Sequence, residues 1–168
     1  PKAEYSLVVA RTKNGQEMRL VLASKLINTV LPKLDLEHVG TRQSIDGKTL
    51  AQELVAGQRS LACQPPFSKG DSIGVTDEGV SLEEGTGVVH IAPGHGHEDY
   101  LIGQREKLEL LSPVDHQGKF TDEVPAFTGK TVFEANPLIV ADLKRRGLLL
   151  HEEPMTHSYP HCWRCKQP

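Results

Sequence analysis

The sequence has few aromatic residues, no long apolar run and no surplus of positive charge. Aromatics make up 5% of its 168 residues, too few to predict a platform on which nucleic-acid bases stack. No apolar run approaches the roughly 20 residues of a membrane-spanning helix, so we expect no membrane partner. The net charge of −3 provides no overall basic field, so any contact with nucleic acid must come from local clusters.

Cysteine is also scarce. Two of the three cysteines share one Cys-x-x-Cys motif, which indicates metal binding or reduced thiols rather than a disulfide framework. The chain starts at Pro1 with neither an initiator Met nor the apolar segment of a signal peptide, which suggests a piece of something longer. Its composition, 38% hydrophobic and 24% charged, is typical of one globular domain that buries its own core.

The order of local patterns predicts many short strands and few helices. Asn14-Gly15 predicts a hairpin between strands at 5–10 and 18–22. A short helix follows Ser24 and ends at Pro32. Further strands are expected at residues 36–44, 73–75, 80–82, 88–91, 110–114 and 148–151. Helices are expected at about 97–107 and from Asn136, as N-cap, to Gly147, as C-cap. This order predicts an α+β domain built on a β-barrel or a folded antiparallel sheet.

The densest group of functional side chains lies in GTGVVHIAPGHGHEDY, residues 85–100, which holds four glycines and three histidines. Residues 88–91 predict a buried strand that Pro93 and Gly94 stop. Glu98 and Asp99 suit the first turn of the next helix, where the helix dipole is positive. A strand end and a helix start therefore meet at a glycine-rich corner, an arrangement typical of small-molecule sites. The alternative is a turn that only reverses the chain.

Cys162 and Cys165 form half of a zinc site, because structural zinc needs four ligands and no second Cys-x-x-Cys is present. Cys63 is isolated in the sequence, and His157 and His161 are possible substitutes for the missing ligands. We interpret the pair as a half-site whose partner knuckle lies outside this chain, and the alternative is two ordinary thiols.

A second metal hypothesis rests on the string His95-x-His97-x-Asp99, which resembles the metal-binding string of metallo-β-lactamase-like hydrolases. That string continues with His, whereas position 100 here is Tyr. The further His and Asp ligands of such enzymes lack matching positions, since Asp115 and His116 fall in a different context. A metallohydrolase is therefore the alternative enzyme.

Two stretches together resemble isoleucyl-tRNA synthetases. Residues 85–100 resemble the signature of the editing domain, and HSYPHCWRC, residues 157–165, resembles the segment that leads back to the catalytic core. Residues 113–120 and 134–136 also fit. The resemblance is good from about residue 61 to residue 168, and the first 60 residues match only in their hairpin-like beginning. Valyl and leucyl relatives carry related central motifs, but His95 and the 157–165 run favour the isoleucyl enzymes.

The resemblance implies a β-barrel-based editing domain of class I synthetases, with peripheral helices, over residues 1–156. Residues 157–168 would begin the return segment and carry the zinc half-site. The parent enzyme joins isoleucine to its tRNA with ATP and Mg, in the cytoplasm or an organelle. The editing domain hydrolyses valine wrongly attached to the 3′ end of tRNA(Ile). Editing is needed because a binding pocket distinguishes substrates that differ by one methylene by only about 10- to 200-fold. Isoleucyl-tRNA synthetase is itself the standard example of this limit.

The resemblance also implies roles for single residues. Asp99 would hold the substrate's α-ammonium, and His90 would form the wall that rejects isoleucine. The residues expected to bind substrate are Gly85, Thr86, Gly87, Val88, Gly94, His95 and Gly96. A positioned water would be the nucleophile, with no metal at the hydrolytic centre. A threonine-rich strand that precedes this region in the family is not in the chain, so we expect an incomplete site. A non-catalytic zinc or tRNA-binding module is the remaining alternative.

Overall fold

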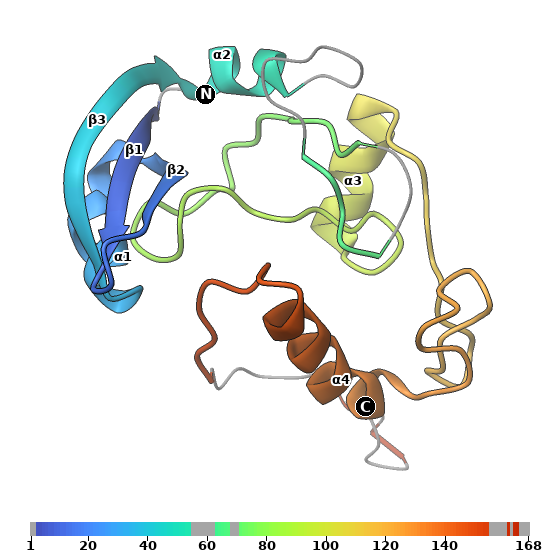
Figure 1. The fold of residues 1–168 in the computed structure, drawn as a ribbon. Helices are drawn as coiled ribbons and strands as arrows, with labels where there is room; N and C mark the ends of the chain where they lie inside the picture. The colour runs from blue at the N-terminus through green and yellow to red at the C-terminus, as the bar shows by residue number, and fades with distance from the viewer. Residues whose placement is uncertain (1–2, 55–62, 68–70, 155–160, 162, 165–168) are drawn as a thin grey trace.

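The computed structural model describes residues 3–54, 63–67, 71–154, 161 and 163–164. Its centre is a three-stranded antiparallel sheet in the order β2-β1-β3 (Figure 1). The strands are β1 (Glu4–Thr12), β2 (Glu17–Ala23) and β3 (Leu36–Asp46). Because β1 is the middle strand, it pairs along its length with both neighbours, for example Tyr5 with Ala23 of β2 and with Ile45 of β3.

The expected hairpin and the strand after it are confirmed. Gly15 has φ +88°, the left-handed conformation that favours glycine. Its N–H donates to the Thr12 carbonyl, and the Thr12 N–H donates to the Gln16 carbonyl, each at 2.9 Å. The Asn14-Gly15 signal therefore sets the turn and, through it, the register of β1 against β2.

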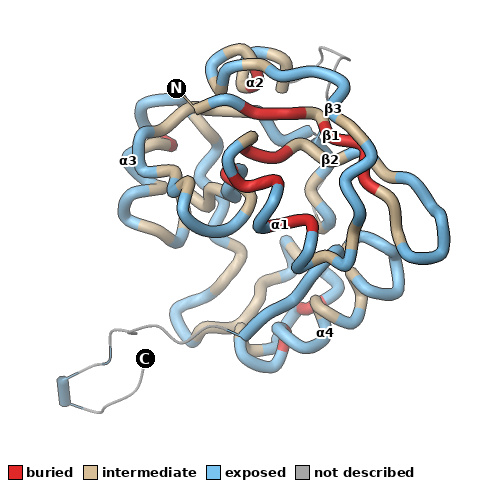
Figure 2. The backbone as a smooth tube through the Cα atoms, turned by 90° about the vertical axis from the view of Figure 1, so that its left-hand side faces the viewer, coloured by how far each residue is buried: buried red, intermediate tan, exposed pale blue. Residues whose placement is uncertain are grey.

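The core lies between this sheet and the short helices around it. A 3₁₀ turn, η1 (Ser24–Leu26), leads into α1 (Ile27–Lys33), and α2 (Gly47–Glu53) follows β3. Ile27, Val30 and Leu31 of α1 pack in one cluster with Val8 of β1 and Leu50 of α2. Figure 2 shows the buried residues concentrated on the sheet and α1. The helix was expected to end at Leu31, before Pro32, but it continues for two residues to Lys33, and Pro32 lies inside its last turn.

The expected α+β class with an antiparallel sheet is confirmed, but the expectation of a closed β-barrel was wrong. Among the described residues both outer strands pair only with β1, so the sheet is open, and no further strand joins it from the described part of residues 63–154. Only isolated bridges occur there, such as Val114 with Phe120. The segments expected as strands at 73–75, 80–82, 110–114 and 148–151 are loops. Segments of three to five residues cannot form strands without a neighbour that supplies a ladder of hydrogen bonds.

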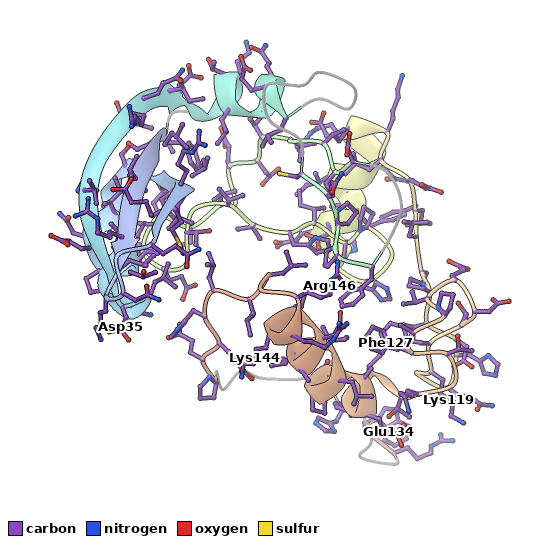
Figure 3. The ribbon with its side chains drawn as sticks, in the orientation of Figure 1. Asp35, Lys119, Phe127, Glu134, Lys144 and Arg146 are labelled. Carbon is purple, nitrogen blue, oxygen red and sulfur yellow. The ribbon has the colours of Figure 1, made fainter. Side chains whose placement is uncertain are left out.

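Two longer helices lie outside the sheet. The expected helix at 97–107 is confirmed as α3 (His97–Glu106), and α4 (Val132–Arg145) follows a loop. Next to α4, Phe127 contacts Phe120 and Phe67, with ring centroids 5.9 and 5.2 Å apart, and Arg146 lies over the Phe67 ring (Figure 3). No helix in the described ranges has the length and apolar character needed to cross a membrane.

The start of α4 differs from expectation. Its N-cap is Thr131, not Asn136, and Pro137 lies inside the helix. The Thr131 side chain accepts from the Glu134 N–H at 3.2 Å, and the Glu134 carboxylate accepts from the Thr131 N–H at 2.8 Å. This reciprocal capping box satisfies two backbone donors at once. It also lowers the pKa of Glu134, chiefly through the Thr131 backbone N–H. The expected end is confirmed, with Gly147 at φ +67° just after the helix.

The cap gives a stability prediction. Thr131→Ala removes the side-chain acceptor at the start of α4 and is expected to lower the free energy of unfolding by about 1 kcal/mol. Thr128→Ala is the matched control, since Thr128 belongs to the preceding loop and its hydroxyl makes only long contacts, 3.3 Å or more. Denaturant unfolding of the two variants measures the difference, and equal midpoints would contradict the role of the cap.

Candidate functional site

The first part of the predicted site, residues 85–88, is a loop fixed on one end of the sheet. The buried Tyr5 hydroxyl donates to the Gly87 carbonyl at 2.7 Å, and the Ala23 N–H donates to the Thr86 carbonyl at 2.9 Å. Gly87 is buried with φ +77°, and a Cβ built there would lie 2.5 Å from the Ala23 Cβ. Only glycine therefore allows this close approach of the loop to β2.

The same loop explains why residues 88–91 are not a strand, as the sequence had suggested. The Thr86 hydroxyl donates to the Val88 carbonyl at 3.0 Å and accepts from the Val88 N–H at 3.2 Å. Both backbone groups that a ladder would use are thus taken by one side chain. Val88 and Val89 are accordingly 49% and 63% exposed, far from the buried strand that their apolar character predicted.

The second part of the predicted site is a tight corner that leads into α3. The His95 and Gly96 N–H groups donate to the Ala92 carbonyl at 2.9 and 3.2 Å. The half-buried Asp99 carboxylate, in the first turn of α3, reaches back and accepts from the Ala92 N–H at 3.0 Å through Oδ2. The corner therefore closes on both backbone groups of Ala92. The predicted helix start beside Asp99 is confirmed, but the strand end that was expected to meet it is wrong, because residues 88–91 are loop.

The corner requires glycine at two positions because a larger side chain would not fit there. A Cβ at Gly94 would lie 2.0 Å from the Leu111 carbonyl oxygen, so the loop and the 110–112 segment touch backbone to backbone. A Cβ at Gly96 would lie 3.0 Å from the Asp99 Oδ2. Gly96 therefore leaves room for the carboxylate, and Gly94 leaves room for the chain beneath it.

The three histidines of this region, His90, His95 and His97, are all exposed. Within the described residues, no group of three or more His, Cys, Asp or Glu side chains is arranged to hold a metal ion. His95, His97 and Asp99 all belong to the described part and do not form such a group with one another. The corner presents the Asp99 carboxylate, held by the Ala92 N–H, beside the backbone of the glycine-rich loop and the exposed imidazoles of the three histidines.

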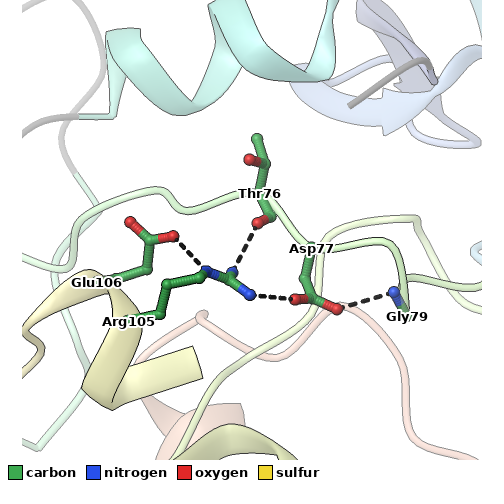
Figure 4. A network of polar contacts seen from close by, with 5 residues as sticks. All are labelled: Thr76, Asp77, Gly79, Arg105 and Glu106. Atoms are coloured by element: carbon green, nitrogen blue, oxygen red, sulfur yellow. Dashed lines mark hydrogen bonds and ion pairs between the residues drawn. The ribbon is translucent and has the colours of Figure 1, made fainter. Parts of the chain in front are cut away.

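Sequence reasoning missed an ion-pair network that ties the far end of α3 to the loop at residues 76–79 (Figure 4). Arg105 donates to Asp77 Oδ2 and to the Thr76 carbonyl, each at 3.1 Å, and to Glu106 at 2.8 Å. The Gly79 N–H, followed by Arg105, lowers the pKa of Asp77. Asp77 and Arg105 lie 28 residues apart, and no local pattern announces such a pair.

Cys162 and Cys165, the predicted zinc half-site, lie outside the described residues, as does His157. Cys63 is described and is an exposed free thiol.

No protein-family model matches the chain. Among curated proteins, the isoleucine–tRNA ligase of Moorella thermoacetica is 40% identical over 168 residues, which is the whole of this chain and 17% of that protein. The isoleucine–tRNA ligase of Caldanaerobacter subterraneus is 42% identical with the same coverage. That of Desulfitobacterium hafniense is 53% identical over 108 residues, 64% of this chain and 12% of the relative.

The chain thus spans about a sixth of the length of the curated relatives that it matches, 17% for the first two. The similarity also includes the first 60 residues, for which the motifs gave little guidance. From its first residue to its last, the chain belongs to the isoleucine–tRNA ligase family and corresponds to one segment of these enzymes.

Proposed function

We propose that this chain belongs to the editing part of an isoleucine–tRNA ligase and that, within the ligase, it provides most of the site that hydrolyses the ester bond of valyl-tRNA(Ile). The observation that carries the proposal is the Asp99 carboxylate at the glycine-rich corner. Its Oδ2 is held by the Ala92 N–H, whereas Oδ1 takes part in none of the hydrogen bonds found among the described residues. A carboxylate fixed through one oxygen is a preorganised acceptor for the ammonium group of an aminoacyl ester.

The chemistry divides among few groups. In the proposal, Asp99 holds the α-ammonium, and the glycine corner lets the ester approach the backbone closely. A water attacks the ester carbon, and the bond to the ribose oxygen breaks to release valine and free tRNA. His90, exposed beside Val89, occupies the space next to the amino-acid side chain. It thereby rejects the extra methylene of isoleucine, which binding alone discriminates weakly.

The partners in this proposal are the 3′ end of tRNA(Ile) and the remainder of the ligase. ATP and Mg serve the joining of isoleucine to tRNA, and none of the steps proposed for this chain uses them. The corner supplies a carboxylate and backbone groups, which suit the recognition of an ester with a free ammonium.

Zinc content tests the proposal for the Cys162 and Cys165 half-site. Two thiolates supply half of the four ligands that structural zinc needs. We expect the isolated chain to hold zinc weakly and the ligase to hold one ion firmly. Elemental analysis after dialysis against a chelator measures both, and a tightly held ion in the isolated chain would contradict the half-site.

A deacylation assay tests the function itself. The ligase that carries this sequence is mixed with valyl-tRNA(Ile) or isoleucyl-tRNA(Ile), and release of the amino acid is followed. We expect rapid hydrolysis of the valyl ester and little of the isoleucyl ester. Addition of a chelator distinguishes editing from the metallohydrolase alternative, because hydrolysis by a metallohydrolase would stop. Equal, slow hydrolysis of both esters, at the rate without enzyme, would overturn the proposal and leave a tRNA-binding module.

A further inference from the structure

We infer that Tyr5 is a positioning residue for the substrate pocket, acting through the loop at residues 85–88. The inference rests on the proposed function, because that loop is expected to line the pocket. The hydroxyl of Tyr5 donates to the Gly87 carbonyl at 2.7 Å across 82 residues of sequence, in a buried contact. Neither the motifs nor the similarity to the ligases assigns Tyr5 a role.

On the sheet side of this contact, the Tyr5 side chain is held rigidly. Tyr5 is 8% exposed and belongs to the core cluster, and β1 pairs it with both Ala23 and Ile45. A Cβ at Gly47, the first residue of α2, would lie 3.0 Å from its ring. The ring is therefore enclosed, so the position of its hydroxyl is set by the fold and not by the loop.

The loop, in contrast, has few anchors. Two hydrogen bonds join it to the sheet, one from Tyr5 to the Gly87 carbonyl and one from the Ala23 N–H to the Thr86 carbonyl. Its last residue, Val88, and the following Val89 are exposed and contribute little packing. One of two fixed points thus depends on a single hydroxyl. Its loss leaves Thr86 and Val88 in place only part of the time.

The test compares two variants that each remove one hydroxyl from β1. Tyr5→Phe keeps the ring and deletes only the donor to Gly87. Ser6→Ala is the matched control, because Ser6 is equally buried but bonds Ser24 and Ser44, at 2.8 and 3.0 Å, and not the loop. Both variants are made in the full ligase, and their melting temperatures are compared.

The expected result is specific to binding. In Tyr5→Phe, KM for valyl-tRNA rises about three- to tenfold, the effect of one buried hydrogen bond, while kcat stays within about twofold. Amide hydrogen exchange at residues 86–88 speeds up, because the loop opens more often. Ser6→Ala leaves both KM and this exchange unchanged. A wild-type KM and wild-type exchange in Tyr5→Phe would overturn the inference.

The controls distinguish a failure of the proposed function from a failure of the positioning role of Tyr5. If the wild-type ligase does not hydrolyse valyl-tRNA, the proposed function fails, and hydrogen exchange at 86–88 still shows whether Tyr5 holds the loop. If editing is present and Tyr5→Phe behaves as wild type, only the positioning role fails. A KM increase of the same size in Ser6→Ala would also overturn it, because the effect would then come from general loss of stability.

Discussion

Replacing Asp99 with alanine in the ligase is expected to reduce hydrolysis of valyl-tRNA(Ile) at least tenfold. In the proposed mechanism the carboxylate makes a charge-assisted contact with the ammonium of the substrate, and such a contact contributes about 1.5–3 kcal/mol. Attachment of isoleucine to tRNA should continue, so valyl-tRNA(Ile) accumulates when valine is supplied. The measurement is the amount of valyl-tRNA(Ile) at steady state together with the rate of deacylation.

Two further variants divide the structural from the chemical role of Asp99. Asp99→Asn retains an oxygen that accepts from the Ala92 N–H but carries no charge, so it keeps the corner and loses the ammonium contact. We therefore expect it to edit nearly as poorly as Asp99→Ala while melting closer to wild type. Glu98→Ala removes the neighbouring exposed carboxylate in the same turn and should edit normally. Normal editing by Asp99→Asn would remove the ammonium contact from the mechanism.

His90→Ala is expected to change which ester is hydrolysed. Truncation opens room for the extra methylene of isoleucine, whose burial contributes about 0.8 kcal/mol, so the pocket no longer rejects it by steric clash. The variant should still hydrolyse valyl-tRNA and should newly hydrolyse isoleucyl-tRNA. Net production of isoleucyl-tRNA then falls although the adenylate forms at the normal rate. Deacylation of both esters by the variant measures this directly.

The melting temperature separates selection from packing in this experiment. His90 is exposed, so its truncation should leave the melting temperature within about a degree of wild type, as for most surface substitutions. His116→Ala is the control, since His116 is an exposed histidine of a turn remote in sequence from the corner. A His90→Ala ligase that melts normally and still spares isoleucyl-tRNA would rule out the excluding wall.

Local sequence patterns gave correct predictions where the interacting residues lie close together in the sequence. The hairpin turn at Asn14-Gly15 and the end of α4 before Gly147 both depend on a glycine in the left-handed conformation. Glycine at such positions is a recognisable sequence signal. The start of α3 beside Asp99 is also a local feature, although its N-cap, Gly96, has an extended conformation. Thr131 and Glu134 have capping-box spacing, so the sequence carried the signal for the α4 cap, but the prediction rested on Asn136 and Pro137 alone.

The barrel and the strand at residues 88–91 could not be judged from local pattern. An apolar, β-branched run forms a strand only if a neighbour pairs with it, and here the Thr86 hydroxyl takes both backbone groups of Val88. The contacts that hold the candidate site are equally remote in sequence. Tyr5 and Gly87 are 82 residues apart, and Arg105 and Asp77 are 28 apart, so only the folded chain brings them together.

The uneven distribution of the core has a consequence for the order in which the chain folds. All buried residues of the main cluster lie between Tyr5 and Leu50, and the widest strand pair within this segment joins Tyr5 and Ile45, 40 positions apart. Closing these contacts costs less loop entropy than closing the contact between Tyr5 and Gly87, 82 positions apart, so we expect the sheet to form first. The loop at 85–88 can dock only onto a sheet that already exists. It therefore belongs to a later and less stable cooperative unit, which can open while the sheet stays folded.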